Sequence, residues 1–218
     1  MVTFVMFLFY ANANEIYIKQ ISGTSTSVTI SQSGTGNTIG DSTAVSTTMD
    51  IDGSSQTIVI NQDGSNNALT GYLKGANSDY TIDLAGSSNT QEINLNATSS
   101  IFDFDVTGSS NELIFNAGAI TGIDNLDFDA LIVGDSNTFD IDILGDDVVD
   151  DLDIDGDSNS ITIDQAAFTA GLTNGHMITL DVTGDSNTIT LDQQATTTQN
   201  IIGLEINGSS GTWSVTQQ

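Results

Sequence analysis

The sequence contains no cysteine, no proline and no arginine, and its only basic residues are Lys19 and Lys74. Without cysteine the chain forms no disulfides, so its stability must come from packing and backbone hydrogen bonds. Without proline, every strand is able to donate backbone hydrogen bonds along its whole length. These absences point away from a small disulfide-bonded domain and toward regular, continuously hydrogen-bonded β-structure.

Positive charge is almost missing, because 29 acidic residues stand against two lysines and give a formal net charge of −27. Such a surface repels phosphate backbones and anionic lipid headgroups, so we expect neither nucleic acid nor an acidic membrane as a partner. An acidic chain with few aromatic residues is often disordered. Isoleucine, leucine, valine and phenylalanine recur here at regular positions, which favours a folded protein whose partner is cationic, neutral or a metal ion.

The N-terminus reads as an export signal. Residues 1–10 are almost wholly apolar and are followed by the small-residue site Ala11-Asn12-Ala13. This pattern predicts a secretory signal peptide over residues 1–13 and an extracellular mature chain over residues 14–218. The apolar run is too short to span a bilayer. The alternative interpretation is a buried first strand.

A short turn recurs along the chain, with glycine first and asparagine three residues later. Eight copies occur, and their commonest spacing is 22 residues. A half-period of 11 residues also appears in Gly53, Gly64, Gly75 and Gly86. The turn residues are Gly34 and Asn37, Gly64 and Asn67, Gly86 and Asn89, Gly108 and Asn111, Gly134 and Asn137, Gly156 and Asn159, Gly184 and Asn187, and finally Gly208 with Gly211.

Apolar and polar residues alternate on both sides of each glycine, as in Ile82 and Leu84 before Gly86 or Leu113 and Phe115 after Gly108. Alternation with period two is typical of strands with one buried face. A constant repeat of strand, turn, strand, turn favours stacked parallel coils over antiparallel hairpins. The sequence therefore predicts an all-β fold, a parallel β-solenoid with about eight 22-residue two-strand coils. Longer spacings are expected in the second turn, in loops such as residues 41–52 and 167–176.

Each turn residue has an expected task. Glycine adopts positive φ without a Cβ clash. The asparagine is expected to tolerate unusual backbone angles and to bond through its amide to the identical amide in the neighbouring coils.

The repeat resembles that of the curlin family, in which glutamines flank the glycine turn at fixed offsets. Gln32 and Gln62 stand two residues before a glycine, and Gln165, Gln193 and Gln217 stand nine after one. The resemblance covers roughly residues 16–218 and implies that the glutamines stack. It also implies a secreted, amyloid-like fibre subunit that forms a homopolymer and serves in a biofilm matrix or in adhesion. From the third copy on, the first glutamine is replaced by an apolar residue such as Leu84.

The acidic residues suggest calcium as the one ligand worth considering. Asp135, Asp157 and Asp185 hold the same turn position in successive copies, and stacked carboxylates ~4.8 Å apart repel one another unless a cation or salt relieves them. Asp150 begins a run that resembles an EF-hand loop, but Thr162 stands at the last ligand position and no helix flanks the run. Apart from possible Ca²⁺, no cofactor is indicated, and these carboxylates are expected to face water.

Catalysis is not favoured, because the single histidine, His176, falls in a predicted exposed loop and no cysteine is present. A polysaccharide-degrading β-helix enzyme remains a minor alternative. The hypotheses with most support are a curli-like structural fibre subunit and, in competition with it, a Ca²⁺-dependent adhesin or phage virion appendage that contacts a cell surface or matrix polymer.

Overall fold

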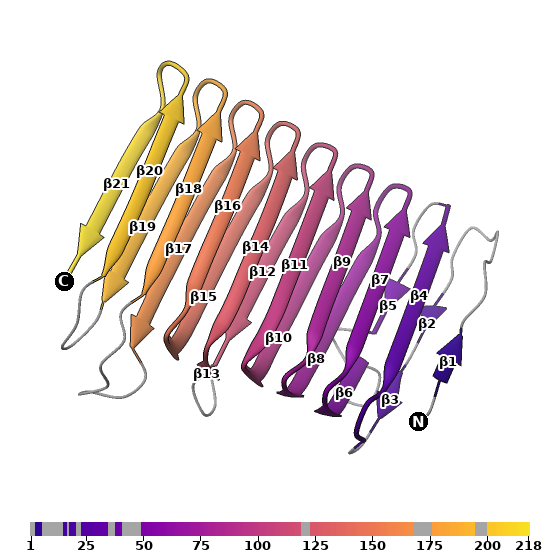
Figure 1. The fold of residues 1–218 in the computed structure, drawn as a ribbon. Helices are drawn as coiled ribbons and strands as arrows, with labels where there is room; N and C mark the ends of the chain where they lie inside the picture. The colour runs from indigo at the N-terminus through magenta and orange to yellow at the C-terminus, as the bar shows by residue number, and fades with distance from the viewer. Residues whose placement is uncertain are drawn as a thin grey trace.

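The computed structural model describes residues 3–5, 15–16, 18–20, 23–34, 38–40, 49–118, 123–167, 176–194 and 200–218. In this part of the chain every element is a strand, and all strand pairs are parallel. The strands stack in chain order from the N-terminal end to the C-terminal end (Figure 1). The predicted all-β parallel solenoid is confirmed.

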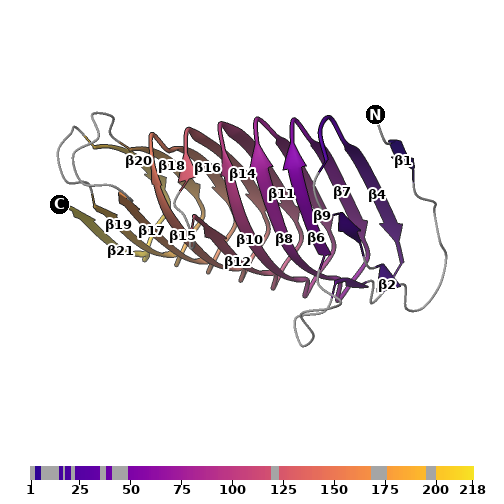
Figure 2. The same ribbon diagram turned by 90° about the horizontal axis from the view of Figure 1, so that it is seen from below.

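Two sheets form the opposite walls of the solenoid (Figure 2). The first sheet comprises β1 (Thr3–Val5), β4 (Ser27–Ser33), β7 (Thr57–Asp63), β9 (Asp79–Ala85), β11 (Ser100–Thr107), β14 (Leu126–Val133), β16 (Val149–Asp155), β18 (Met177–Thr183) and β20 (Ile201–Asn207). The second comprises β2 (Glu15–Ile16), β5 (Thr38–Ile39), β8 (Ala68–Ala76), β10 (Thr90–Thr98), β12 (Glu112–Ala117), β15 (Thr138–Asp146), β17 (Ser160–Ala167), β19 (Thr188–Gln194) and β21 (Thr212–Gln217), with β3 (Lys19–Gln20), β6 (Met49–Ser54) and β13 (Ile123–Asp124) beside this path.

The predicted number and length of the coils are slightly off. The first sheet has nine strands in its described order rather than eight. Equivalent residues are 22 residues apart in several coils but 24, 26, 28 or 30 apart in others. The sequence pattern missed the first coil because residues 1–22 contain no glycine. The longer spacings lie in the second turn, as expected.

The core fills the space between the two sheets, where the alternation of the strands is confirmed. Strand β14 reads buried and exposed in strict succession, as does β16. An aromatic cluster crosses the middle of the body: the ring centroids of Phe102 and Phe128, neighbours in the first sheet, lie 5.8 Å apart, and Phe115 from the second sheet lies 4.7 Å from both. Each coil therefore buries its apolar face only with the help of its neighbours.

The two edges of the body differ, as the glycine pattern predicted. The glycine turn always spans four residues between a strand of the first sheet and one of the second, whereas the opposite connection varies in length. The prediction of a loop over residues 41–52 is wrong in part, because Met49–Asp52 belongs to β6. The strand resumes there because Met49, Ile51 and their register partners Gly71 and Leu73 continue the ladder of β8.

The expected signal peptide is described only over Thr3–Val5, which form β1 and pair with Ser27–Thr29 of β4. The rest of residues 1–13 lies outside the described residues. Cleavage near Asn14 stays a prediction. No helix in the described part of the chain is long and apolar enough to cross a membrane.

Candidate functional site

The glycine turns form a continuous edge along the solenoid. Gly108 has a φ of +133°, and a Cβ at this residue would overlap the carbonyl oxygen of Gly86 in the preceding coil. Glycine is therefore required both for its backbone conformation and for the close approach of the coils. The expected unusual angle at asparagine is wrong: positive φ falls on the residue before it, as in Ser110 (φ 61°).

The asparagines stand in one column, and each links two coils. The backbone N–H of Asn89 donates to Oδ1 of Asn111 at 3.1 Å, and that of Asn111 donates to Oδ1 of Asn137 at 2.9 Å. The predicted amide-to-amide ladder is thus wrong in detail, because the donor is the backbone and only the acceptor is a side chain. Its column runs, within the described residues, through Asn67, Asn89, Asn111, Asn137, Asn159 and Asn187. Asn37 lies outside the described residues.

A second ladder at the same turn runs in the opposite direction. Oδ1 of Asp135 accepts the backbone N–H of Asp157 at 2.7 Å, and Oδ1 of Asp157 accepts that of Asp185 at 2.5 Å. Asp185 in turn accepts the backbone N–H and the hydroxyl of Ser209, and these bonds lower the pKa of its carboxyl. The three aspartates predicted as calcium ligands therefore do form a column, and its carboxylates cap the next coil.

Metal-ligand geometry is not apparent in the described part of the chain, where no group of three or more His, Cys, Asp or Glu side chains is placed to hold an ion. Carboxylates nevertheless gather on the outer faces. Burial raises the pKa of Asp142, and its neighbours Asp140 and Asp164 raise it further. In the first sheet, burial and then Asp127, Asp151 and Asp103 raise the pKa of Asp129. Calcium binding at Asp135, Asp157 and Asp185 stays a prediction.

The glutamines named by the repeat stack as expected. Nε2 of Gln62 donates to Oε1 of Gln32 at 2.8 Å inside the first sheet. Nε2 of Gln193 donates to Oε1 of Gln165 at 2.8 Å in the second sheet, and Nε2 of Gln217 donates to Oε1 of Gln193 at 3.0 Å. The two ladders lie in different sheets and at opposite ends of the body.

Two titratable residues lie in the core, where the sequence analysis placed them in water. Asp150 is fully buried, and its Oδ2 accepts a hydrogen bond of 3.1 Å from Nε2 of Gln165. Burial raises the pKa of Asp150 well above its usual range, with further contributions from Asp127 and Asp129. His176 is also buried, which lowers its pKa although Asp146 acts in the opposite sense. The alternation reveals Asp150 as inward-facing, since Leu152 and Ile154 lie on the same face of β16.

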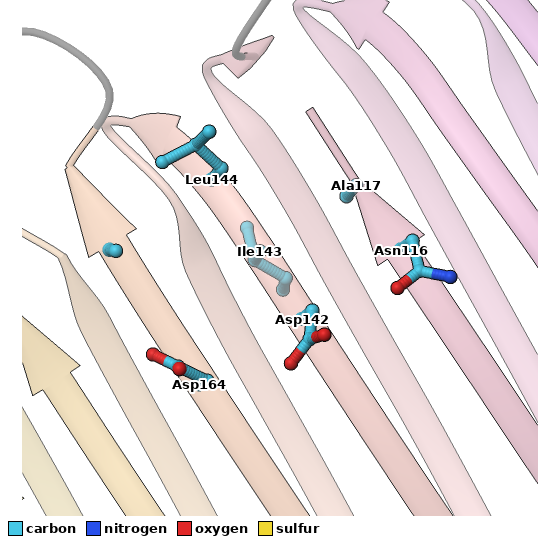
Figure 3. A pocket seen from close by; sticks show the side chains of 7 residues that line it. Asn116, Ala117, Asp142, Ile143, Leu144 and Asp164 are labelled. Atoms are coloured by element: carbon cyan, nitrogen blue, oxygen red, sulfur yellow. The ribbon is translucent and has the colours of Figure 1, made fainter. Parts of the chain in front are cut away.

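A shallow depression of about 190 Å³ lies on the outer face of the second sheet (Figure 3). Ala117, Ile143 and Leu144 form its apolar part, and Asp142 and Asp164 stand on its carboxylate side. The depression follows the end of β12, which stops at Ala117 while β15 beside it continues to Asp146.

The C-terminal end of the solenoid is open. Strands β20 and β21 pair only with β18 and β19 in the described structure, so one edge of each has unpaired backbone groups. Side chains that continue the buried columns are uncovered there: Leu204 is 40%, Trp213 43% and Val215 46% exposed. The indole of Trp213 lies against Gly211, which replaces the asparagine of the earlier turns.

Comparison with known proteins gave no matching family model, no matching curated protein and no matching solved structure. The curlin resemblance accordingly stays a hypothesis drawn from the repeat itself.

Among the described surfaces, the C-terminal end has the features of an interface for further strands. Two unpaired parallel strand edges and an uncovered apolar interior make the C-terminal end a template for further strands. The sequence analysis named Gln217 in this coil from the glutamine spacing. It did not predict that the aspartate and asparagine ladders run in opposite directions, because the direction depends on side-chain rotamers that the spacing does not specify.

Proposed function

We propose that this protein is a structural subunit of a secreted, extracellular, curli-like fibre in which solenoids stack end to end. The observation that carries the proposal is the open C-terminal end. Its β20 and β21 edges lack partners on one side, and Trp213 and Val215 occupy positions that are buried in every fully covered coil.

Stacking a second copy on this end would satisfy both needs. The unpaired backbone groups of β21 would gain, from β2 and β3 of the second copy, the hydrogen bonds that every internal coil has. Burying one large apolar side chain contributes about 1.5–3 kcal/mol, and Leu204, Trp213 and Val215 all lie uncovered at this end. The molecule itself is thus the partner that fits best, and a matrix or adhesive role follows from a long, acidic, regularly patterned fibre.

Imaging of the purified chain over residues 14–218 tests the proposal. We expect unbranched filaments by electron microscopy and a thioflavin signal that grows with time. The variant Val215→Asp places a charge in the open apolar end and should suppress filaments, whereas Ser214→Asp, which changes the neighbouring outward-facing residue, should leave them intact. Wild-type protein that stays monomeric at high concentration for days would refute the fibre.

A second candidate is a Ca²⁺-dependent adhesin or phage appendage, favoured by a row of neighbouring carboxylates in which, in addition to burial, Asp164 raises the pKa of Asp142 and Asp192 raises that of Asp164. A divalent cation would relieve that repulsion. Calorimetric titration with Ca²⁺ tests this candidate: micromolar binding with a large rise in melting temperature supports it, and the absence of heat or stabilisation counts against it.

A further inference from the structure

The glutamine ladder of the second sheet has a direction and an anchor. Gln217 donates to Gln193, Gln193 donates to Gln165, and Gln165 donates to the buried carboxyl of Asp150. Every amide thus donates toward the N-terminal side, and Asp150 is the last acceptor. The residue before Gln165 in this column is Ile143, which offers no acceptor, so Asp150 supplies the partner that the last amide needs. At the C-terminal end, Gln217 is the last residue of this ladder.

The register of the second sheet identifies which residue stands at the other end of the same column. Following the strand pairs back from Gln217, the column passes through Leu95 and Leu73 to Ile51 and ends at Gln20 in β3. A glutamine therefore stands at both ends of one column. The column of Trp213 behaves in the same way and ends at Ile16 in β2. One translation along the axis places glutamine over glutamine and tryptophan over isoleucine together.

The charge distribution also favours contact between the N-terminal end of one copy and the C-terminal end of another. Both lysines of the sequence, Lys19 and Lys74, belong to the first coils, and Lys74 lies 3.3 Å from Asp50. Carboxylates gather in the later coils, where Asp142, Asp164 and Asp192 share one column with the register position of Lys19. Contact between an N-terminal end and a C-terminal end brings opposite charges closer, whereas two C-terminal ends would repel each other.

We infer that copies of this protein join head to tail and in register, with Gln217 of one copy stacked on Gln20 of the next so that the glutamine ladder crosses the junction. The inference rests on the proposed fibre and adds its polarity and register. The partner at the C-terminal end is thereby a second copy whose first coil has Gln20 at the register position of Gln217, and the first and last coils act as the two halves of one interface.

Single cysteines test the junction cleanly because the chain has none of its own. Adjacent coils lie about 4.8 Å apart, within the Cα separation of about 4.4–6.8 Å that a disulfide spans. Filaments grown from an equal mixture of Gln20→Cys and Gln217→Cys protein should form covalent dimers on mild oxidation, and filaments of either variant alone should not. Lys19→Cys mixed with Gln217→Cys is the register control and should remain uncrosslinked, because neighbouring residues of a strand face opposite sides.

Elongation rates give a second measurement without cysteine. Gln217→Leu removes the acceptor at the junction and should weaken copy addition about fivefold, the effect of one hydrogen bond of about 1 kcal/mol. Gln194→Leu, at an exposed residue of β19, should leave elongation unchanged. Filaments that form normally but crosslink through Gln217→Cys alone, or through Lys19→Cys as readily as through Gln20→Cys, would overturn the junction while leaving the fibre in place. Absence of wild-type filaments would overturn both.

Discussion

Five repeat glycines each meet two demands at one residue: Gly86, Gly108, Gly134, Gly156 and Gly184. Each has a positive φ, and a Cβ on it would overlap the carbonyl oxygen of the glycine one coil earlier, as at Gly108 against Gly86. Gly203 is different, because a Cβ there would lie 3.8 Å from its nearest neighbour, the carbonyl oxygen of Ile178. The chain thus contains a matched pair of glycines, one required by geometry and one not.

Gly108→Ala should lower the free energy of unfolding by at least about 2 kcal/mol, because the strained φ and the overlap with Gly86 act together. Gly203→Ala should change it by less than about 1 kcal/mol. Urea unfolding followed by circular dichroism measures both. Equal losses in the two variants would show that the turn does not depend on close contact between coils.

Asn137 tests the asparagine ladder. Its Oδ1 accepts the backbone N–H of Asn111, and its Nδ2 donates to the carbonyl of Gly134 at 2.8 Å. Asn137→Ala leaves a buried donor without its acceptor and should cost about 1–3 kcal/mol of unfolding free energy. Asn116→Ala is the control, since Asn116 is only partly buried. A similar small effect in both variants would mean that water replaces the ladder.

At the scale of the element, one coil is the unit that the chain repeats. Strands β7, β9 and β11 pair in succession at a spacing of 22 residues, so Thr57, Asp79 and Ile101 occupy one column. Contacts between strands that are not neighbours in the stack contribute little, because each coil packs mainly on the one before and the one after it. The structure should therefore accept the loss of a whole coil but not of half of one.

Deletion of residues 79–100 removes one coil and should leave a folded solenoid of lower stability, with Ile101 following Ser78 at the same corner. Deletion of residues 79–89 removes one strand with its turn. The alternation is kept, because Thr90 and Gln91 are exposed and buried as Asp79 and Tyr80 are, but every later strand changes sheet and its glycine turn moves to the other edge. The glycine turns then no longer stack on one another, so this deletion should abolish cooperative folding. Circular dichroism and thermal melting distinguish the two. A folded half-coil deletion would contradict the stacked-coil account of stability.

For the whole molecule, repulsion among the carboxylates is the main influence on how stability depends on pH. Among the described residues, burial and neighbouring carboxylates raise the pKa of a set of aspartates: Asp83, Asp105, Asp129, Asp142, Asp150 and Asp164. A raised folded pKa means that the stabilising contribution is complete below the ordinary value of 3.8 and is lost as the pH rises through the folded value. His176 and Asp185, whose pKa values are lowered, oppose this trend.

The melting temperature should accordingly be higher at about pH 4.5 than at about pH 7.5 in low salt, the reverse of an ordinary acid-labile protein. Added salt should narrow the difference, because it screens the exposed carboxylates. Asp150→Asn should stabilise the protein at neutral pH and flatten the pH profile, whereas Asp153→Asn at an exposed residue of the same strand should do less. A melting temperature that falls steadily with acid would show that His176 and Asp185 dominate.

Much of this architecture follows from the sequence by itself. Alternation fixes which residues face inward, the glycine turns fix where each coil reverses, and repetition makes parallel stacking of identical residues the most favourable arrangement. Gln32 with Gln62, and Gln165 with Gln193, are paired in the structure as their spacing predicts. These features are local or repeat at a fixed interval, so no knowledge of distant contacts is needed to predict them.

Only the tertiary structure decided the rest. The direction of the asparagine and aspartate ladders depends on which neighbouring coil each side chain reaches. The bond between the buried Asp150 and Gln165 depends on two strands meeting across the core, which no spacing along one strand reveals. The shared column of Gln20 and Gln217 exists only because the insertions between them lie outside the ladder. The strand register is therefore kept although the coils differ in length.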